Sequence, residues 1–269
     1  MLYFVATPIG NLKDITYRAV EILNEVDEIA CEDTRHSITL LNYYGIKKPL
    51  FSYHKFNERE ESEKIAEKLK SGKNIAVISD AGMPVISDPG NILAKTLIEE
   101  GLEFTVIPGA NAALSALVLS GFNADRFCFI GFLPGKKSDR EELLASYKDC
   151  PATLIFYSAP HDVKKDAQSL FYAFGNRKAA AVKEITKIHE KAIFFDLENG
   201  FPEEPKGEFV LIVDGANKNC DALELSEEEH IKKYISMGMD KKEALKKVAK
   251  ERGVSKSSLY KYTIGENGE

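Results

Sequence analysis

The sequence predicts an α/β fold made of two α/β lobes and a small helical domain at the C-terminal end. Over the first 120 residues, short apolar runs alternate with segments of helical periodicity, which is typical of a mostly parallel sheet covered by helices. From about residue 127 onward, strand-like runs follow one another with less helix between them, which indicates a mixed sheet. The last part of the chain has a basic, helical pattern.

The first lobe is expected to span residues 1–121. Strands are predicted at 2–6, 29–31, 51–54, 75–78 and 104–107, with helices at 15–26, 57–70 and 92–100 and two more that end at Tyr44 and Ser120. Asp14 is a candidate cap for the first helix. The run Ile75–Ile78 is apolar at every position, so it predicts a strand buried on both faces.

The second lobe is expected to span residues 122–215, with the boundary near Gly121 to Asp125. Strands are predicted at 127–132, 153–157, 179–184, 191–197 and 209–213, with helices that end at Tyr147 and Phe174. Two lobes of unlike pattern imply a cleft between them, and such clefts are a preferred place for ligands.

The C-terminal extension, residues 222–269, follows a polar linker at 215–221 and includes helices predicted at 225–236 and 240–251. Gly253 ends the second of these, and Ser255 is placed to cap a further basic helix, in a helix-turn-helix spacing. From Ile231 to Tyr262 ten Lys or Arg stand against three Asp or Glu. Such a segment either contacts nucleic acid or packs on the body of the protein.

Composition narrows the function classes. The formal net charge of −6 argues against non-specific nucleic-acid binding by the whole surface. No apolar run has membrane-spanning length, and the start of the chain lacks the basic segment of a signal peptide, so we expect a cytoplasmic protein. The four cysteines lie far apart without metal-type spacing, and we expect unpaired thiols and no metal.

Loops at the carboxyl ends of predicted strands gather the polar and small residues. They are residues 7–11, 32–36, 79–89, 108–115 and 157–159. In open α/β sheets ligands bind in the crevice at this edge. The glycine pattern of dinucleotide-binding folds and the P-loop are both absent from the sequence. Backbone amides and a few carboxylates in such loops suit a nucleoside ligand.

Several motifs, in order, carry a resemblance to a known family. They are Ala6-Thr7-Pro8-Ile9-Gly10-Asn11-Leu12, Glu32-Asp33-Thr34-Arg35, Ser79-Asp80-Ala81-Gly82-Met83-Pro84 with Ser87-Asp88-Pro89-Gly90, Asp125-Arg126-Phe127 with Gly131-Phe132-Leu133-Pro134, and Lys206-Gly207-Glu208. Over nearly its whole length the chain resembles the ribosomal small-subunit RNA 2′-O-ribose methyltransferases of the tetrapyrrole (class III) methylase superfamily. These enzymes modify a cytidine in the decoding region.

The resemblance implies that S-adenosylmethionine binds in the cleft between the lobes. By position, the implied cofactor-binding residues are Pro8, Asp80, Gly82, Met83, Ile86, Ala113, Ser115, Tyr157 and Ser158. It also implies a homodimer. The implied substrate is small-subunit ribosomal RNA, either naked or in the assembled subunit.

Two other functions stay open, a tetrapyrrole methylase and a non-catalytic nucleoside-binding protein. Relatives that act on tetrapyrroles often have Gly-Gly-Asp-Pro in the third loop, where this chain has Ala81-Gly82-Met83-Pro84. The missing carboxylate favours the RNA-acting branch. The basic extension favours it too, because a tetrapyrrole needs no basic appendage.

A ribose 2′-hydroxyl is a poor nucleophile, so a base, or a cation that stabilises the alkoxide, would help. We assign Glu32, Asp33 and Arg35 to catalysis or ribose positioning. The alternative is an ion-paired loop in which Glu32 or Asp33 holds Arg35. A second charged cluster is Lys183, Glu184 and Lys187.

The basic residues expected to contact RNA are Lys136, Lys137, Arg140, Lys256 and Lys261. For residues 136–140 the alternative is a solvated helix start. His54 and His161 are interpreted as ordinary surface or packing histidines. Since the implied RNA is highly structured, recognition should depend on shape and backbone more than on a linear code.

Overall fold

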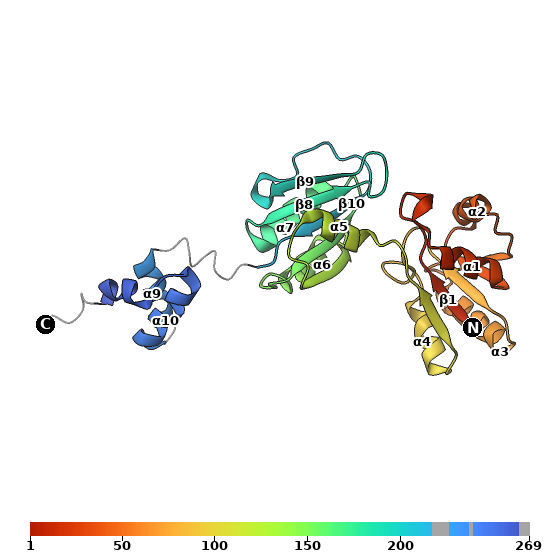
Figure 1. The fold of residues 1–269 in the computed structure, drawn as a ribbon, viewed down its shortest axis with the longest axis horizontal. Helices are drawn as coiled ribbons and strands as arrows, with labels where there is room; N and C mark the ends of the chain where they lie inside the picture. The colour runs from red at the N-terminus through yellow and green to blue at the C-terminus, as the bar shows by residue number, and fades with distance from the viewer. Residues whose placement is uncertain (217–225, 237–238, 264–269) are drawn as a thin grey trace. The chain divides into compact units, whose positions relative to one another are not determined.

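A computed structural model of the chain describes residues 1–216, 226–236 and 239–263 (Figure 1). It contains two compact units, one of residues 1–146 and 152–214 and the other of residues 147–151 and 215–269. Most of the expected linker, the start of the helix predicted at 225 and Cys220 lie outside the described residues. In the described ranges no helix is long and apolar enough to cross a membrane.

The first sheet has five strands in the order β3-β2-β4-β1-β5, and every neighbouring pair is parallel. The strands are β1 (Leu2–Val5), β2 (Glu28–Cys31), β3 (Leu50–Ser52), β4 (Ile75–Ile78) and β5 (Phe104–Ile107). The prediction of a parallel sheet in the first lobe is therefore confirmed. All five strands end at one edge, which gathers the loops that follow them.

Helices cover both faces of this sheet. They are α1 (Tyr17–Glu25), α2 (Thr34–Tyr43), α3 (Glu58–Lys70) and α4 (Asn91–Glu99). Along β4, Ala76 and Ile78 share a core with α1 and α2, whereas Ile75 and Val77 share a core with α3 and α4. The alternation explains why this strand is apolar throughout, as predicted. The cap of α1 is Thr16 instead of Asp14, because residues 12–14 form a 3-10 turn before it.

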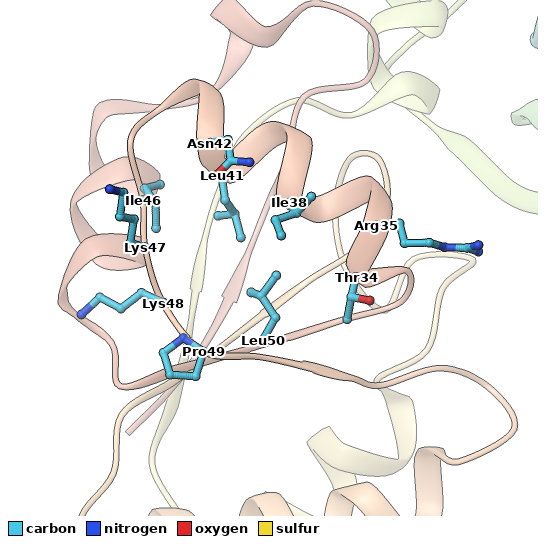
Figure 2. A pocket seen from close by; sticks show the side chains of 10 residues that line it. All are labelled: Thr34, Arg35, Ile38, Leu41, Asn42, Ile46, Lys47, Lys48, Pro49 and Leu50. Carbon is cyan, nitrogen blue, oxygen red and sulfur yellow. The ribbon is translucent and has the colours of Figure 1, made fainter.

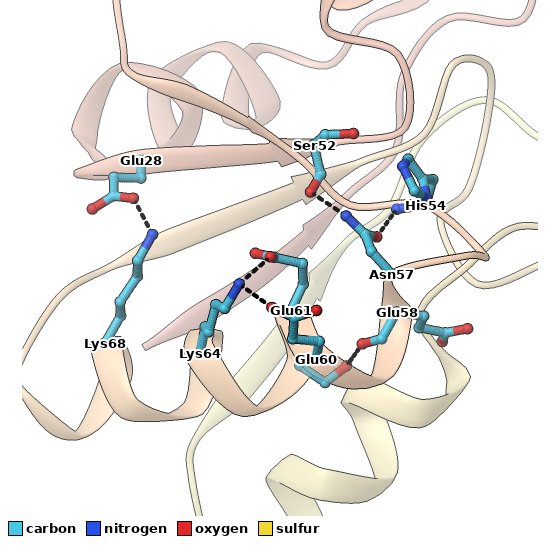
Figure 3. Close-up of polar contacts among 10 residues, drawn as sticks. Glu28, Ser52, His54, Asn57, Glu58, Glu60, Glu61, Lys64 and Lys68 are labelled. Atoms are coloured by element: carbon cyan, nitrogen blue, oxygen red, sulfur yellow. Dashed lines mark hydrogen bonds and ion pairs between the residues drawn. The ribbon is translucent and has the colours of Figure 1, made fainter.

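Figure 3 shows how the chain turns from β3 into α3. The Asn57 side chain donates a hydrogen bond of 3.0 Å to the carbonyl of Ser52 and accepts one of 2.8 Å from the amide of His54. On the helix itself, Lys64 pairs with Glu60 and Glu61. The ion pairs of Lys64 lie within α3 and contribute little stability. The Asn57 side chain and a backbone hydrogen bond of 3.0 Å from the Asn57 amide to the His54 carbonyl stabilise the turn.

The second sheet has five strands in the order β6-β7-β10-β8-β9. The strands are β6 (Phe127–Phe132), β7 (Thr153–Ser158), β8 (Lys178–Lys183), β9 (Lys191–Asp196) and β10 (Phe209–Val213). β6 and β7 are parallel, and the other neighbouring pairs are antiparallel. The prediction of a mixed second sheet is confirmed. Two further helices, α6 (Lys137–Ala145) and α7 (Val163–Phe174), belong to this lobe.

Helix α5 (Ala112–Ser120) packs on the second sheet (Figure 1). Its residues Ala113 and Leu117 share a buried cluster with Ile155 and Ile212. The chain therefore leaves the first sheet at 108–111, before this helix, whereas the expected boundary near Gly121 lies after it. The helix is apolar on every side, so its sequence pattern alone could not indicate which sheet it covers.

The extension contains α9 (Glu227–Ser236), α10 (Lys241–Arg252), the short α11 (Lys256–Leu259) and a 3-10 turn, η3 (Tyr260–Thr263). Its small core includes Ile231, Leu245, Val248 and Leu259. The Ser255 side chain accepts a hydrogen bond of 3.2 Å from the amide of Ser258, so Ser255 caps α11 as expected. These helices have a core of their own.

Candidate functional site

A pocket with a volume of about 470 Å³ lies among the loops that follow strands of both sheets. Its lining residues are Ile9, Glu32, Asp80, Ala81, Gly82, Met83, Ile86, Ser87, Asp88, Asn111, Ala112, Phe132, Tyr157, Ser158, Ala159, Pro160, Ile185, Glu208, Phe209 and Val210. This is the strand edge at which the sequence predicts a ligand. Its size is that of a small-molecule site.

The loops after β1 and β4 are joined by a short antiparallel bridge. The amide of Thr7 donates to the carbonyl of Gly82 at 2.8 Å, and the amide of Gly82 donates back to Thr7 at 3.1 Å. Gly82 has a φ of +80°, and a Cβ there would come within 3.2 Å of Ile9 Cγ2. Glycine therefore suits this position both in backbone conformation and in space.

Two loops beside the pocket contain strained backbone. Val85 and Ser87 have φ values of 74° and 68°, and Glu184 and Thr186 have values of 50° and 67°. Each such residue costs on the order of 1–3 kcal/mol and persists only where its surroundings enforce it. Their neighbours Ile86 and Ile185 line the pocket. The strain thus lies where the loops shape the site.

Four carboxylates line the pocket, those of Glu32, Asp80, Asp88 and Glu208. Burial raises the pKa of Glu32, and the nearby Asp80 adds to the effect. Burial also raises the pKa of Asp88 to about 6, with further repulsion from Glu32 and Asp80, while a hydrogen bond from Ser79 opposes the rise. Since a cation would relieve this repulsion, the site favours a positively charged ligand.

Six of the nine residues expected to bind a cofactor line the pocket. They are Asp80, Gly82, Met83, Ile86, Tyr157 and Ser158. Pro8 is buried next to Ile9, which lines the pocket in its place. Ala113 and Ser115 are also absent from the lining, because α5 begins just before them and presents Asn111 and Ala112 to the pocket.

An aromatic group forms part of the second-lobe wall. The rings of Phe132 and Phe129 lie 5.4 and 4.9 Å from the Tyr157 ring, measured between centroids. Ser158 donates a hydrogen bond of 2.6 Å to the buried Asp166, which fixes its hydroxyl. The sequence indicates Phe132 only as part of a motif. It carries no pattern that places Ile185 or Val210 here, since Ile185 comes from the loop after β8 and Val210 from β10.

The residues of the charged cluster after β2 do not all face the pocket. Glu32 lines the pocket, and the amide of Asp33 donates a hydrogen bond of 3.3 Å to Asp80. The Asp33 carboxylate caps α2 and pairs with Arg35 at 3.0 Å, and this pairing lowers the pKa of Asp33 to about 2. The Arg35 side chain is 90% exposed. The alternative of an ion-paired loop therefore describes Asp33 and Arg35, and it does not describe Glu32.

The second charged cluster holds two loops together. Lys187 pairs with Glu184 and with Glu208, both at 3.1 Å. The stem of Lys187 also covers Gly10, where a Cβ would come within 2.8 Å of Lys187 Cγ. Lys183 pairs instead with Glu203. The Ile9-Gly10 loop of the first lobe is thus seated against the 184–187 loop of the second.

The residues expected to contact RNA differ in exposure. Lys136 and Lys137 are exposed and pair with Asp139 and Glu141 on their own helix. The Arg140 side chain is only 6% exposed, lies 3.8 Å from Asp166, and donates to the carbonyl of Gly135. As placed, Arg140 cannot reach a phosphate, because α7 covers it.

In the extension, Lys256 begins α11, and its Nζ lies 6.0 Å from the centre of the Tyr260 ring. Lys261 lies in η3, and its side chain is outside the described part.

His54 and His161 differ in burial and in surroundings. His161 is exposed and lies 3.2 Å from Asp162. His54 is half-buried and is not among the pocket-lining residues, although it is close enough to Glu32 to oppose the rise in the pKa of Glu32. Across the described ranges, no three His, Cys, Asp or Glu side chains converge in a way that could hold a metal ion.

The fold is that of a class of methylases. The profile of the tetrapyrrole (corrin/porphyrin) methylases matches residues 1–199, and the chain belongs to this family. Within it, the chain is 44% identical to "Ribosomal RNA small subunit methyltransferase I" of Halalkalibacterium halodurans, over 96% of this chain and 93% of the relative. The protein of the same name from Bacillus subtilis is 43% identical, over 97% and 92% of the two chains.

Solved structures support the fold. A uroporphyrin-III-C-methyltransferase from Thermus thermophilus superimposes with a TM-score of 0.57 at 18% identity, covering 79% of this chain and 93% of its own. A diphthine synthase gives a TM-score of 0.62 at 16% identity, covering 80% and 90%. Another structure of the Thermus thermophilus enzyme, with a TM-score of 0.55 at 16% identity, covers 79% and 96% and is complexed with S-adenyl homocysteine.

Proposed function

We propose that the chain is an S-adenosylmethionine-dependent methyltransferase that methylates the ribose 2′-hydroxyl of a cytidine in the decoding region of small-subunit ribosomal RNA. The observation that carries this proposal is the 44% identity, over 96% of the chain, to a ribosomal RNA small subunit methyltransferase. Such coverage must include most of the basic extension from residue 222 on. We place the enzyme in the cytoplasm, where its substrate is found.

The lining of the pocket suits this cofactor. S-adenosylmethionine carries a sulfonium and an ammonium, and Glu32, Asp80 and Asp88 are the carboxylates that would face such charges. Tyr157 and Ile86 offer an apolar surface for the adenine. Pro8, Ala113 and Ser115 would then act from behind the lining, by supporting Ile9 and the start of α5.

When bound, the cofactor supplies an electrophilic methyl group. The residues of the chain must orient the ribose hydroxyl toward this methyl group and accept the hydroxyl proton. We assign the proton to the Glu32 carboxylate, which lines the pocket and whose pKa is raised by burial. Asp33 positions Asp80 through its amide, and the Arg35 side chain, which is 90% exposed although it pairs with Asp33, contacts the RNA backbone.

Asp80 tests the cofactor assignment. We expect Asp80→Ala to weaken S-adenosylmethionine binding at least tenfold in calorimetry, and to reduce methyl transfer to match. Glu32→Gln should instead keep the cofactor and lower kcat by about 10²-fold or more, as for loss of a general base. If the chain is a non-catalytic nucleoside-binding protein, Asp80→Ala weakens binding, but the wild-type protein shows no methyl transfer.

The substrate is tested by supplying small subunits that lack the modification, naked ribosomal RNA and a tetrapyrrole in parallel, and by mapping the methylated nucleotide. Transfer to the tetrapyrrole with none to RNA would overturn the proposal. That alternative is favoured by the family profile. Against it stand the Ala81-Gly82-Met83-Pro84 loop and the basic extension.

The proposed RNA contacts lie on the extension and on the second lobe. Lys136 and Lys137 are exposed, and Lys256 begins α11. Lys261 stays a predicted RNA contact, whereas the buried Arg140 is not one. A protein that ends at residue 221 should still bind S-adenosylmethionine and should methylate RNA poorly. Equal loss of both activities would mean that the extension supports the fold.

We also propose a homodimer. Helix α5 covers the second sheet with one side, while Leu114, Val118 and Leu119 stay exposed on the other. A helix that is apolar all round is normally buried on both sides. A second copy of the chain is the partner that this surface fits best, because a symmetric contact buries the same patch twice.

A further inference from the structure

A groove of about 660 Å³ lies on the first lobe, between α2 and the segment that leads into β3 (Figure 2). It begins at Thr34 and Arg35, directly after Glu32 and Asp33, and is distinct from the pocket described above. Since Glu32 belongs to the pocket and Arg35 to the groove, the two sites are neighbours along the chain.

The rim of the groove is positive. Arg35, Lys47 and Lys48 line it, and the lining includes no aspartate or glutamate. Among the described residues no carboxylate pairs with Lys47 or Lys48. Arg35 pairs with Asp33, which lies outside the groove lining, whereas Lys47 and Lys48 add two positive charges without a carboxylate partner among the described residues. In a chain with a formal net charge of −6, these two lysines favour an anionic partner.

The floor of the groove is apolar. It consists of Ile38, Leu41, Ile46 and Leu50. Leu41 and Ile46 are buried in the core beneath, and Ile38 is 50% exposed. In Figure 2, Arg35 stands at one end of this floor and Lys47 and Lys48 at the other, with Ile38 and Leu50 between them. Cations at both ends of an apolar floor match a nucleotide that has a phosphate on either side.

We propose that this groove binds the strand of the substrate RNA next to the target ribose. One flanking nucleotide lies on Ile38 and Leu50, and its phosphates meet Arg35 at one end and Lys47 and Lys48 at the other. The proposal rests on the proposed function, which supplies the RNA. It adds a first-lobe contact to those of the extension and brings the strand to the edge where Glu32 lines the pocket.

The test is RNA affinity as a function of salt. Because each phosphate contact that is lost lowers the slope of log K against log salt by about 0.7–0.9, Lys47→Gln/Lys48→Gln should lower it by about 1.4–1.8. The KM for small subunits should rise at least tenfold at physiological salt, with S-adenosylmethionine affinity unchanged. Lys47→Arg/Lys48→Arg should keep the wild-type slope.

The matched control is Lys95→Gln/Lys178→Gln, which removes the same charge from exposed lysines of α4 and β8. If the Lys47/Lys48 variant has the same slope and KM as this control, the groove does not bind RNA and the inference is overturned. Ile38→Ser should weaken RNA binding without changing the slope, because it removes apolar contact and no charge. A change in slope for Ile38→Ser would also count against the proposed arrangement.

Failure of the proposed function can be distinguished from failure of the groove proposal. If the wild-type chain binds small subunits but transfers no methyl group, the proposed function is overturned. The slopes of log K against log salt still show whether the groove binds RNA. If the wild-type chain binds no RNA under any salt condition, both proposals are overturned together.

Discussion

The Glu58 carboxylate accepts a hydrogen bond of 2.8 Å from the backbone amide of Gly90. The same oxygen accepts a second hydrogen bond of 3.0 Å from the amide of Ile92. Gly90 occupies the cap position of α4 and has no side chain to fill that role, so a residue of α3 caps the helix from outside. Glu58 thereby fixes the end of the loop that carries Asp80 and Asp88.

We expect Glu58→Ala to destabilise the protein by about 1–2 kcal/mol, as for loss of a helix cap. Cofactor affinity should fall as well, because the loop from residue 80 to 90 loses its anchor. Urea unfolding and calorimetry measure the two effects. Glu63→Ala, at an exposed position of the same helix, should leave both unchanged. Loss of stability with wild-type affinity would show that the loop does not depend on the cap.

Asp88 should make stability depend on pH. Its pKa is about 6 in the folded protein against an ordinary value of 3.8, so the folded state holds the proton more tightly. Stability is then highest below about pH 4, falls as the pH rises to about 6, and is level above that. After allowance for partial exposure, Asp88→Asn should be more stable than wild type by about 1–2 kcal/mol at pH 7. The gain should vanish near pH 4 in urea unfolding.

The same carboxyl should link cofactor binding to pH. A cationic ligand favours ionised Asp88, so affinity for S-adenosylmethionine should rise between pH 5 and 7 and binding should release protons near pH 6. Calorimetry in buffers of different ionisation enthalpy detects the release. Asp88→Asn should reduce it, and an unchanged release in that variant would exclude Asp88 as the source.

Arg140 should matter for folding more than for RNA. Its removal leaves the buried Asp166 with the Ser158 hydrogen bond and without its ion-pair partner, so Arg140→Met should destabilise the protein by about 3–5 kcal/mol. Arg140→Met/Asp166→Leu should recover much of this loss, because no charge stays buried alone. Lys137→Met, at an exposed position, should leave stability unchanged. Normal stability with weaker RNA binding in Arg140→Met would restore the phosphate contact predicted from sequence.

The exposed side of α5 should control the oligomeric state. Val118, 77% exposed in one chain, becomes buried in the proposed dimer, and Val118→Glu should give particles with the 30.0 kDa mass of one chain in sedimentation. Ile98→Glu, at an exposed position of α4, should sediment as wild type does. A wild-type chain that sediments only as a monomer at working concentration would exclude the dimer.

Much of the fold could be predicted because single stretches carry enough information. The run Ile75–Ile78 is apolar at every position, and the structure buries it between two helical layers. Helix α5 could not be assigned to a sheet in the same way. Its small and apolar residues fit either layer, and the choice depends on contacts with strands that come some 40 to 100 residues later.

For the site, local sequence predicted the loops better than the individual side chains. Asp80 and Met83 were found because they follow a strand within a recognisable motif. The burial of Arg140 depends on Asp166, which lies on another helix, and nothing around residue 140 indicates it. The sequence indicates Asp88 only as part of a motif, and its place beside Glu32 and Asp80 makes it part of the acidic lining.

The left-handed residues beside the pocket have a consequence for engineering. Val85, Ser87, Glu184 and Thr186 adopt a backbone conformation that glycine or asparagine would adopt with less strain. A selection for heat resistance alone would therefore favour replacements at these four positions, since relieving strain raises the melting temperature. The same replacements would let the two loops relax away from the pocket. A thermostable library of this enzyme should be screened for turnover as well as for folding.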